Sequence, residues 1–390
     1  MPEHDVVVVG GGQAGLAVSH ELARAGVEHV VLERSRVAQT WRDRWDSFCL
    51  VTPNWSLQLP GHHYDGDDPD GFDDRDAVVA YLERYADDLP LQEGVTATSL
   101  TQRDAGFVLE TSAGTLTPTQ VILATGAYQR AHRPAGLPQH LDIGDYRNPG
   151  ELPDGPVLVI GSGQSGCQIA EDLLRAGRDV FLSCGRAPWS PRRLGGKDLV
   201  WWLHESGFLD QPVSALPDPA ARLFGNVQAT GHGGGHDLHY RTLRRDGVTL
   251  LGRFLGADGR RARFADDLGA SVAWGDERNA QLMQLFRTVA PLDVPPPEPF
   301  DPAAPEELDL AGFGAVIVAG GFRPDYARWV HIPGAFDAHG FPLHEEGAST
   351  VAGGLSFAGV HFLRKRKSTL FIGIGEDAAI VAGRVADRVG

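Results

Sequence analysis

Cysteine is scarce in this chain, and long apolar runs are absent. The 390 residues include three cysteines, Cys49, Cys167 and Cys184, which are odd in number and far apart. This pattern predicts reduced thiols and argues against a disulfide framework. No run of about 18 apolar residues occurs, and no charged segment followed by an apolar one opens the chain. We therefore expect no membrane span, no secretion signal and a cytoplasmic location.

Positive charge is also in short supply. Lys and Arg total 35 against 51 Asp and Glu, which gives a formal net charge of −16. This excess of negative charge argues against nucleic acid or an anionic membrane as the main partner. Glycine, with 49 residues, and hydrophobic residues, at 42%, are plentiful. These amounts predict about two to three folded domains with a sizeable core and many tight turns.

The N-terminal segment follows the order strand, glycine-rich turn, helix, strand. Residues 5–9 (DVVVV) form a β-branched run typical of a strand buried on both faces, and the turn at 10–15 (GGGQAG) follows directly. Residues 16–25 (LAVSHELARA) predict a helix, and residues 29–32 (HVVL) predict a second strand. This order predicts a βαβ unit.

Three glycines of this turn fit the G-x-G-x-x-G pattern of a dinucleotide site. Gly10 makes the tight turn, Gly12 lets the backbone approach a pyrophosphate, and Gly15 lets the helix pack on the strand. The helix N-terminus offers free N–H groups to the phosphates. Glu33, at the end of the second strand, is placed to accept hydrogen bonds from an adenosine ribose. The motif predicts a bound dinucleotide, with a purely structural turn as the alternative. Further contacts are expected from Gln13, Ala14 and Arg34.

The same order returns in the middle of the chain. A strand at 156–160 (PVLVI) leads into a turn at 161–166 (GSGQSG), and a helix at 167–176 and a strand at 179–183 follow. This order predicts a second dinucleotide site at the second turn. Its expected contacts are Gly161, Gly163, Gln164, Ser165 and Gly166.

The second site differs from the first in the residues that follow its second strand. Ser183 and Arg186 stand where the first unit has its acid, and Arg192 and Arg193 follow. An acid would repel a 2′-phosphate, whereas Ser and Arg suit one. We therefore expect this site to prefer NADPH over NADH. The alternative is that these arginines only solvate a loop.

Two complete dinucleotide sites in one chain indicate two redox carriers, and the usual pair is a flavin and a nicotinamide. The first site has no obvious substrate domain of its own, which suits a tightly held FAD. The predicted fold is α/β, with two Rossmann-like dinucleotide-binding domains. We expect a discontinuous FAD domain formed by residues 1–148 and 306–390, into which an NADPH domain at 153–305 is inserted.

The remaining elements are predicted from periodicity and capping residues. Residues 76–87 predict a helix with Asp74 or Asp76 as its N-cap. Further helices are expected at 198–205, 278–289 and 377–388. Strands are expected near 105–110, 120–124, 247–251, 261–264, 315–319 and 370–374, and a proline-rich linker at 291–305.

Several motifs together resemble the flavin-containing monooxygenases (class B), which are flavoproteins with two dinucleotide domains. Beyond the first turn and its acid, the matching stretches are 40–60 (TWRDRWDSFCLVTPNWSLQLP), 124–126 (ATG), 316–326 (VIVAGGFRPDY) and 373–377 (GIGED). The last resembles a segment whose helix N-terminus faces the flavin pyrimidine ring. The family includes YUCCA-type, N-hydroxylating and Baeyer–Villiger monooxygenases, and the resemblance covers nearly the whole chain. Outside 40–60, it implies cofactor contacts at Ala124, Thr125, Gly126, Gly320, Gly375 and Asp377.

The segment 40–60 resembles the part of the family that packs against the flavin. The resemblance places Trp41, Trp45 and Thr52 beside the ring, with ordinary core packing of the tryptophans as the alternative. Asn54 is the candidate catalytic residue, because the family places a polar side chain near the flavin C4a in this region. A plain turn residue after a proline is the alternative for Asn54.

The resemblance implies an FAD-dependent monooxygenase that uses NADPH and O2 to oxygenate a small molecule through a C4a-(hydro)peroxyflavin. N- or S-oxygenation is favoured, and a Baeyer–Villiger reaction is an alternative. One motif departs from the family, because Asp142 fills the position of the His in H-x-x-x-Y, with His140 two residues earlier and Tyr146 at the end. The departure leaves room for an NADPH-dependent flavin reductase or oxidase. A binding module that senses NADPH through a bound flavin is a further alternative. A homo-oligomer stays open.

Other clusters give weaker signals. His232, His236 and His239 lie in a glycine-rich stretch that is poorly suited to rigid ligands, so no metal is expected. The aspartates of 65–76 lack the glycine of a calcium loop. The basic run at 364–367 either faces water or reaches a cofactor phosphate. No pair of cysteines has the spacing of a redox motif, which argues against a disulfide reductase.

Overall fold

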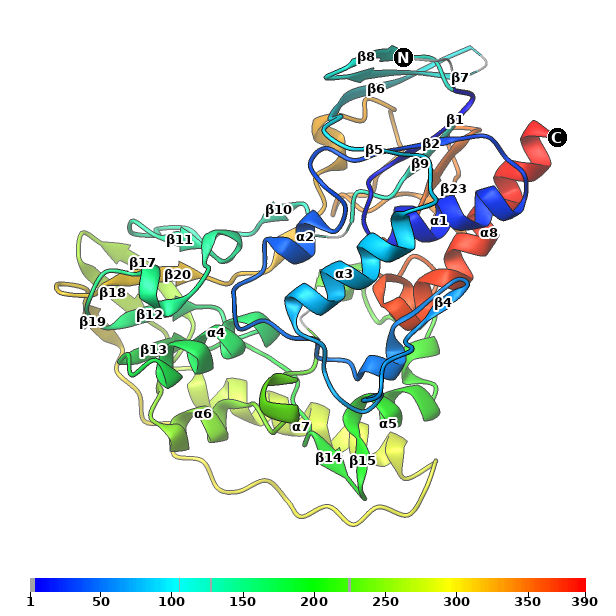
Figure 1. Ribbon diagram of the computed structural model, residues 1–390. Coiled ribbons are helices and arrows are strands. Elements are labelled where there is room, and N and C mark those ends of the chain that lie inside the picture. The colour runs from blue at the N-terminus through cyan, green and yellow to red at the C-terminus, as the bar shows by residue number, and fades with distance from the viewer. Residues whose placement is uncertain (1–3, 105, 127, 224–225) are drawn as a thin grey trace.

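The computed structural model describes residues 4–104, 106–126, 128–223 and 226–390. The chain forms two lobes (Figure 1). The upper lobe of that view holds the N-terminal and C-terminal parts of the chain, and the lower lobe is built mainly from its middle. Each lobe contains one sheet whose central strands are parallel, and a glycine-rich turn follows a central strand of each sheet.

The upper lobe is built on a seven-stranded sheet in which β1 lies between β9 and β2. All the central pairings are parallel, with Val7 beside Val30 on one side and beside Val121 on the other. In strand order, the sheet consists of β22 (His344–Glu345), β23 (Ala348–Ser349), β24 (Leu355–Phe357), β9 (Gln120–Leu123), β1 (Val6–Val9), β2 (Val30–Leu32) and β5 (Leu91–Gln92).

Both faces of this sheet are covered, which explains why β1 is apolar at every position. Side chains alternate along a strand, so Val6 and Val8 pack against helices while Val7 and Val9 pack against a small antiparallel sheet. The helices are α1 (Gln13–Arg24), α3 (Arg75–Ala86) and α8 (Phe371–Val389), and the strands are β6 (Ala97–Arg103), β7 (Gly106–Thr111) and β8 (Gly114–Leu116).

The lower lobe repeats this plan with five parallel strands. Val157 and Val159 of its central strand face helices, and Leu158 and Ile160 face an antiparallel sheet. In strand order, the parallel sheet consists of β11 (Leu141–Asp142), β20 (Ala315–Val318), β12 (Val157–Ile160), β13 (Val180–Ser183) and β16 (Thr249–Leu251). The covering elements are α4 (Gln164–Arg175), α6 (Tyr240–Asp246), β17 (Phe254–Asp258), β18 (Arg261–Phe264) and β19 (Glu307–Asp309).

The lower lobe has a further cluster of buried hydrophobic side chains, in which Trp202 and Phe286 pack together. It is built from β14 (Arg193–Leu194), β15 (Lys197–Asp198), α5 (Leu199–Glu205) and α7 (Leu268–Phe286). Short elements connect the lobes or cap the upper one: α2 (Gln39–Arg42), β3 (Gln58–Leu59), β4 (His62–His63), β10 (Arg130–Ala131) and β21 (Phe322–Arg323). Figure 1 places α2 and β10 between the two lobes.

The predicted α/β fold with two dinucleotide-binding sheets is confirmed, and both glycine-rich units form. Asp74 is the N-cap of α3, where its carboxylate accepts a hydrogen bond from the backbone N–H of Ala77 at 2.8 Å. The helix expected at 278–289 is the second half of the longer helix α7. Among the described residues, no helix has the length and apolar character needed to cross a membrane.

Two expectations are wrong. Residues 370–374 are not a strand, because α8 begins at Phe371 and this apolar run forms its first turn. The boundary at 305 is also misplaced, because β19 and β20 belong to the sheets of the lower lobe. In addition, β11, which was expected in the first part of the FAD domain, pairs with β20. The segment of the lower lobe therefore extends on both sides of 153–305.

Candidate functional site

The first glycine-rich turn forms an open cradle at the N-terminus of α1. Gly10 has a φ of +115°, and a Cβ atom there would lie 2.5 Å from the carbonyl oxygen of Ala124. A Cβ at Gly15 would lie 1.8 Å from the Gly10 carbonyl oxygen, so neither position accepts a side chain. A Cβ at Gly12 would meet nothing within 4 Å. This open space beside free N–H groups fits a dinucleotide pyrophosphate.

Glu33 lies beside the same turn. Its carboxylate accepts hydrogen bonds from the backbone N–H groups of Gly11 at 2.8 Å and Ser35 at 2.9 Å. These bonds hold the acid at the carboxyl end of β2, next to the cradle, where a ribose of the bound dinucleotide is expected. Arg34 is exposed. Ala124 directly follows β9 and lies against Gly10, so the ATG stretch begins beside the cradle.

The second turn repeats this geometry at the N-terminus of α4. Gly161 has a φ of +106°, and its Cβ would lie 2.4 Å from the carbonyl oxygen of Ala319. A Cβ at Gly166 would lie 1.9 Å from the Gly161 carbonyl oxygen, whereas one at Gly163 would meet nothing within 4 Å. Gly320 directly follows Ala319, so it lies beside this second turn, and its cofactor contact stays a prediction.

The two residues expected to bind a 2′-phosphate, Ser183 and Arg186, differ in their exposure. Arg186 is exposed just beyond β13, and no ion pair or hydrogen bond joins its guanidinium to any described residue. Ser183 is buried, and its hydroxyl donates to the carbonyl of Gly252 and accepts from the N–H of Phe254, each at 3.0 Å. The Ser183 hydroxyl therefore fixes the backbone of the adjacent strand, which leaves Arg186 as the available contact.

Arg192 connects the lobes and does not face a cofactor. Its side chain is 1% exposed, forms an ion pair with Asp198 at 2.9 Å and donates to the carbonyl of Val51 at 2.8 Å. Its guanidinium also lies 4.3 Å from the centre of the Phe72 ring. Burial disfavours the charged form of both side chains, so it lowers the pKa of Arg192 and raises the pKa of Asp198.

The N-termini of α1 and α8 meet at Gln13. The Gln13 amide donates to the carbonyl of Thr369 at 2.8 Å, and its oxygen accepts from the indole N–H of Trp41 at 3.0 Å. Trp41 stacks on Phe371 with ring centres 5.6 Å apart. Trp41 thus lies beside the cradle, whereas Trp45 is 3% exposed and belongs to the apolar core of the lower lobe.

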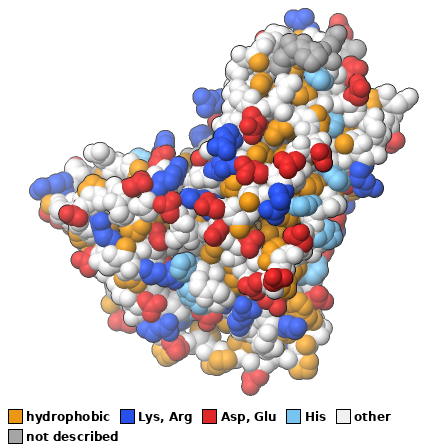
Figure 2. All heavy atoms as spheres, in the orientation of Figure 1, with side chains coloured by type: hydrophobic (Ala, Val, Ile, Leu, Met, Phe, Trp, Pro, Cys, Tyr) orange, Lys and Arg blue, Asp and Glu red, His pale blue; other side chains and the backbone are white. Residues whose placement is uncertain are grey.

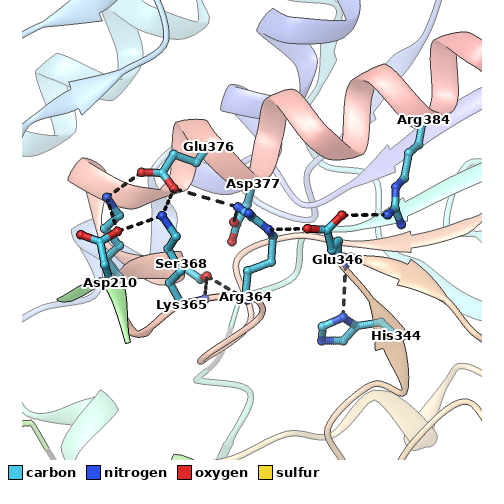
Figure 3. A network of polar contacts seen from close by, with 11 residues as sticks. Asp210, His344, Glu346, Arg364, Lys365, Ser368, Glu376, Asp377 and Arg384 are labelled. Carbon is cyan, nitrogen blue, oxygen red and sulfur yellow. Dashed lines mark hydrogen bonds and ion pairs between the residues drawn. The ribbon is translucent and has the colours of Figure 1, made fainter. Parts of the chain in front are cut away.

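An ion network fixes the start of α8 to the lower lobe (Figure 3). Lys365 and Lys367 both pair with Asp210 and with Glu376, at distances between 2.6 and 3.1 Å. Asp377 is 2% exposed and accepts from Arg364 at 3.1 Å. The basic run at 364–367 is therefore neither a solvated surface nor a phosphate site, since it joins α8 to the segment after α5.

This network corrects the expected roles of Gly375 and Asp377. Both residues lie more than one turn inside α8 and not at its N-terminus, which begins at Phe371. Asp377 is committed to Arg364, and a Cβ at Gly375 would lie 3.2 Å from Pro60. In this structure Asp377 forms an ion pair and Gly375 packs against Pro60. The turn just before α8 reaches the cradle through the hydrogen bond from Gln13 to Thr369.

Asn54, the candidate catalytic residue, is held within its own loop. Its amide nitrogen donates to the carbonyl of Asp68 at 3.0 Å, and its oxygen accepts from the N–H of Asp73 at 2.6 Å. The side chain is 2% exposed. The structure argues against a catalytic role, because neither end of the amide is free. Thr52 is half-buried nearby.

The altered motif before the second turn has a structural use. Asp142 accepts from the guanidinium of Arg133, which lowers the pKa of the carboxyl, and His140 lies 3.8 Å away. Tyr146 is fully buried and donates to the carboxylate of Asp172 at 2.6 Å. These contacts anchor the segment that connects the two lobes.

The histidine stretch also contributes structure. His236 bonds to the carboxylate of Glu171, and His239 caps the N-terminus of α6. Across the described ranges, no group of three or more His, Cys, Asp or Glu is placed to hold a metal ion.

The three cysteines are free, and burial raises the pKa of each thiol, to about 11 for Cys49. Cys167 and Cys184 are fully buried in the core of the lower lobe. A redox pair needs an accessible, low-pKa thiol. The cysteines are therefore unsuited to disulfide exchange.

One cluster of polar side chains between the lobes was not predicted from the sequence. Arg44 follows α2, Tyr128 precedes β10, and His361 follows β24. The Arg44 guanidinium lies 5.7 Å from the centre of the Tyr128 ring, which is 5.2 Å from that of His361. The three residues are far apart in the sequence, and no spacing rule relates them. Figure 2 shows the surface hollowed between the two lobes.

Comparison with known proteins identifies a family and several relatives. The sequence model of the pyridine nucleotide-disulphide oxidoreductases matches residues 7–204. An uncharacterized CzcO-like oxidoreductase of Geobacillus kaustophilus is 30% identical over 392 residues, which is 96% of each chain. A probable indole-3-pyruvate monooxygenase of Arabidopsis thaliana, YUCCA3, is 30% identical over 213 residues, covering 49% of this chain and 48% of the plant protein.

Among solved structures, a flavin-containing monooxygenase from Stenotrophomonas maltophilia is similar over the full length of both chains. The TM-score is 0.70 at 19% sequence identity, which shows a shared fold.

Proposed function

We propose the following function for this chain, which belongs to the pyridine nucleotide-disulphide oxidoreductase family. The chain is an oxidoreductase of the flavin-containing monooxygenase type, and its cofactors are FAD and NADPH. Within that frame, it transfers one oxygen atom of O2 to a small-molecule substrate at the expense of NADPH. The proposal rests on one combination: the chain has two open glycine cradles, and its three cysteines offer no usable thiol pair.

The residues of the two turns account for cofactor placement. The N–H groups at Gly12 would hold the FAD pyrophosphate, and Glu33 would bind its ribose. Gly163 offers the corresponding cradle to NADPH, and Arg186 would bind its 2′-phosphate. The flavin, when bound, supplies hydride acceptance and O2 activation. The protein supplies position, through the contact of Gln13 with both helix N-termini.

The cysteines argue against delivery of electrons to a disulfide. In a disulfide reductase of this fold, the flavin passes electrons to a thiol pair that is accessible and easily ionised. Cys167 and Cys184 are buried in apolar surroundings, and burial raises the pKa of both thiols. The flavin would therefore pass its electrons to an external acceptor, and we propose that this acceptor is O2.

We favour oxygenation of an amine or a sulfide over insertion of oxygen beside a ketone. An amine or sulfide accepts oxygen through its own lone pair and needs no base from the protein. The plant relatives are named indole-3-pyruvate monooxygenases, and from them we adopt the reaction class and not the substrate.

The test is the balance of NADPH, O2 and hydrogen peroxide in the FAD-loaded enzyme. A panel of aryl sulfides and tertiary amines serves as substrate probes. A monooxygenase consumes NADPH faster with an active probe and releases less peroxide, with one oxygenated product per NADPH. Release of one peroxide per NADPH with every probe would support the flavin oxidase alternative, which the altered motif at Asp142 keeps open.

A further inference from the structure

The cofactor sites leave the cluster of Arg44, Tyr128 and His361 unused. All three side chains belong to segments that surround the FAD cradle. Arg44 lies three residues after Trp41, Tyr128 follows the ATG stretch, and His361 follows Gly359, whose Cβ would lie 2.6 Å from Ala14. The Tyr128 ring also contacts Phe322 of β21, with ring centres 5.3 Å apart. The cluster therefore lies where the cradle meets the connection to the lower lobe.

Among the described residues, Arg44 contacts aromatic rings but pairs with no carboxylate. Within the described ranges, no carboxylate lies within 4.0 Å of its guanidinium, and the guanidinium donates no hydrogen bond. Its Nε atom is buried and unbonded. The nearest acid in sequence, Asp43, instead accepts from the amide of Gln39 at 2.8 Å. The buried Arg192, in contrast, has both an ion pair and a carbonyl acceptor.

A sheltered guanidinium without a partner is costly, because desolvation of the charge is not compensated. Burial accordingly lowers the pKa of Arg44. Folded proteins rarely leave such a group unpaired unless a ligand completes it. A carboxylate suits the fork of an arginine, since two parallel N–H···O bonds form at once.

Aromatic rings flank Arg44, and the nearest negative charge named by its electrostatics is the exposed carboxylate of Asp43. The Phe48 and Tyr128 rings lie 5.6 and 5.7 Å from the guanidinium carbon. Burial lowers the pKa of His361 to about 4, so its imidazole is neutral near pH 7, and burial raises the pKa of Tyr128, so its phenol is protonated. Tyr128 is nevertheless 46% exposed, so its ring lines an accessible surface between the lobes.

We propose that Arg44 binds the carboxylate of the substrate, and that the aromatic rings of Phe48, Tyr128 and Phe322 contact an apolar body. The substrate class is therefore an organic acid whose apolar part carries the atom to be oxygenated. This inference rests on the proposed function, because it assumes a small-molecule substrate at the junction of the lobes. The cofactor phosphates are assigned to the cradles at Gly12 and Gly163 and do not compete for Arg44.

The test is calorimetric titration of the FAD-loaded enzyme with two probes of nearly equal shape, 3-phenylpropanoate and its neutral amide. The wild type is expected to bind the acid at least about tenfold more tightly than the amide, as one charge-assisted hydrogen-bonded pair implies. Arg44→Met should bind both probes alike. Arg44→Lys should retain part of the preference, because it keeps the charge.

Arg130→Met is the matched control. Arg130 is a neighbouring exposed arginine that already lies 3.6 Å from Asp325, so its loss should leave the preference for the acid unchanged. Equal binding of the two probes by the wild type, no binding of the acid, or a preference that survives in Arg44→Met would overturn the proposal. Loss of FAD from Arg44→Met would also overturn it, because Arg44 would then be a cofactor residue.

This measurement separates the two proposals. Calorimetry needs no turnover, so an enzyme that prefers the acid but converts all its NADPH into peroxide would contradict the proposed monooxygenase function alone. An enzyme that oxygenates neutral probes efficiently while it ignores the acid would contradict the assignment of Arg44 alone.

Discussion

Replacement of Arg186 by alanine tests the assignment of the second cradle to NADPH. Arg186 is exposed beyond β13, and its guanidinium has no partner among the described residues, so its removal leaves no orphaned group. Charge-assisted hydrogen bonds to a phosphate contribute about 1.5–3 kcal/mol. Solvent screening at an exposed site reduces this contribution toward the lower end of the range. We therefore expect the half-saturating NADPH concentration to rise about 10- to 30-fold.

The assay is anaerobic reduction of the bound flavin by NADPH and by NADH, followed over a range of nucleotide concentrations. Arg186→Ala should weaken NADPH and leave NADH nearly unchanged, because only NADPH carries the 2′-phosphate. Arg193→Ala is the matched control, since this exposed neighbour already donates to the carbonyl of Gly234 at 3.3 Å. Equal weakening of both nucleotides, or no weakening of either, would refute the assignment of Arg186.

Three further predictions follow from the geometry. Gly12→Val fills the first cradle, so the purified protein should lack FAD, whereas Gly163→Val should stay yellow but resist reduction by NADPH; a yellow Gly12→Val protein would contradict the first site. Arg192→Met removes the closer cation from the buried Asp198 carboxylate, which keeps Arg193 at 3.7 Å and the Val200 N–H at 2.8 Å. The free energy of unfolding in urea should fall by about 3 kcal/mol, and a loss under about 1 kcal/mol would count against the pair. The hydrogen bond to Glu171 raises the pKa of His236, so the stability that this pair contributes is complete below about pH 6.5 and is lost as the pH rises through the raised folded pKa. His236→Gln should therefore destabilise the protein more at about pH 5.5 than at about pH 8.5, and equal losses would contradict the pairing.

The parts of the fold that depend on local sequence were predictable. The turns at 10–15 and 161–166 formed as expected, because their glycines satisfy steric conditions that a Cβ would violate at Gly10, Gly15 and their counterparts. The N-cap at Asp74 was also predictable from local sequence, because a capping side chain bonds to a backbone N–H only three residues later.

Other features depend on contacts that a single sequence does not reveal. The run LFIGI at 370–374 suits a buried strand or a buried helix, and packing of α8 against α1 decides for the helix. Asp377 was assigned to the cofactor because its motif fits, but its partner Arg364 comes from a separate turn. The cluster around Arg44 is made by three distant segments, so only the folded chain shows that its charge is unpaired.

The most direct test of the account is the fate of the oxygen atoms of O2. The FAD-loaded enzyme is supplied with NADPH, ¹⁸O2 and the probe that most accelerates NADPH consumption, and the product is analysed by mass spectrometry. The account predicts one ¹⁸O atom in the product for each NADPH consumed. Product without ¹⁸O, or label recovered only in hydrogen peroxide and water, would contradict it.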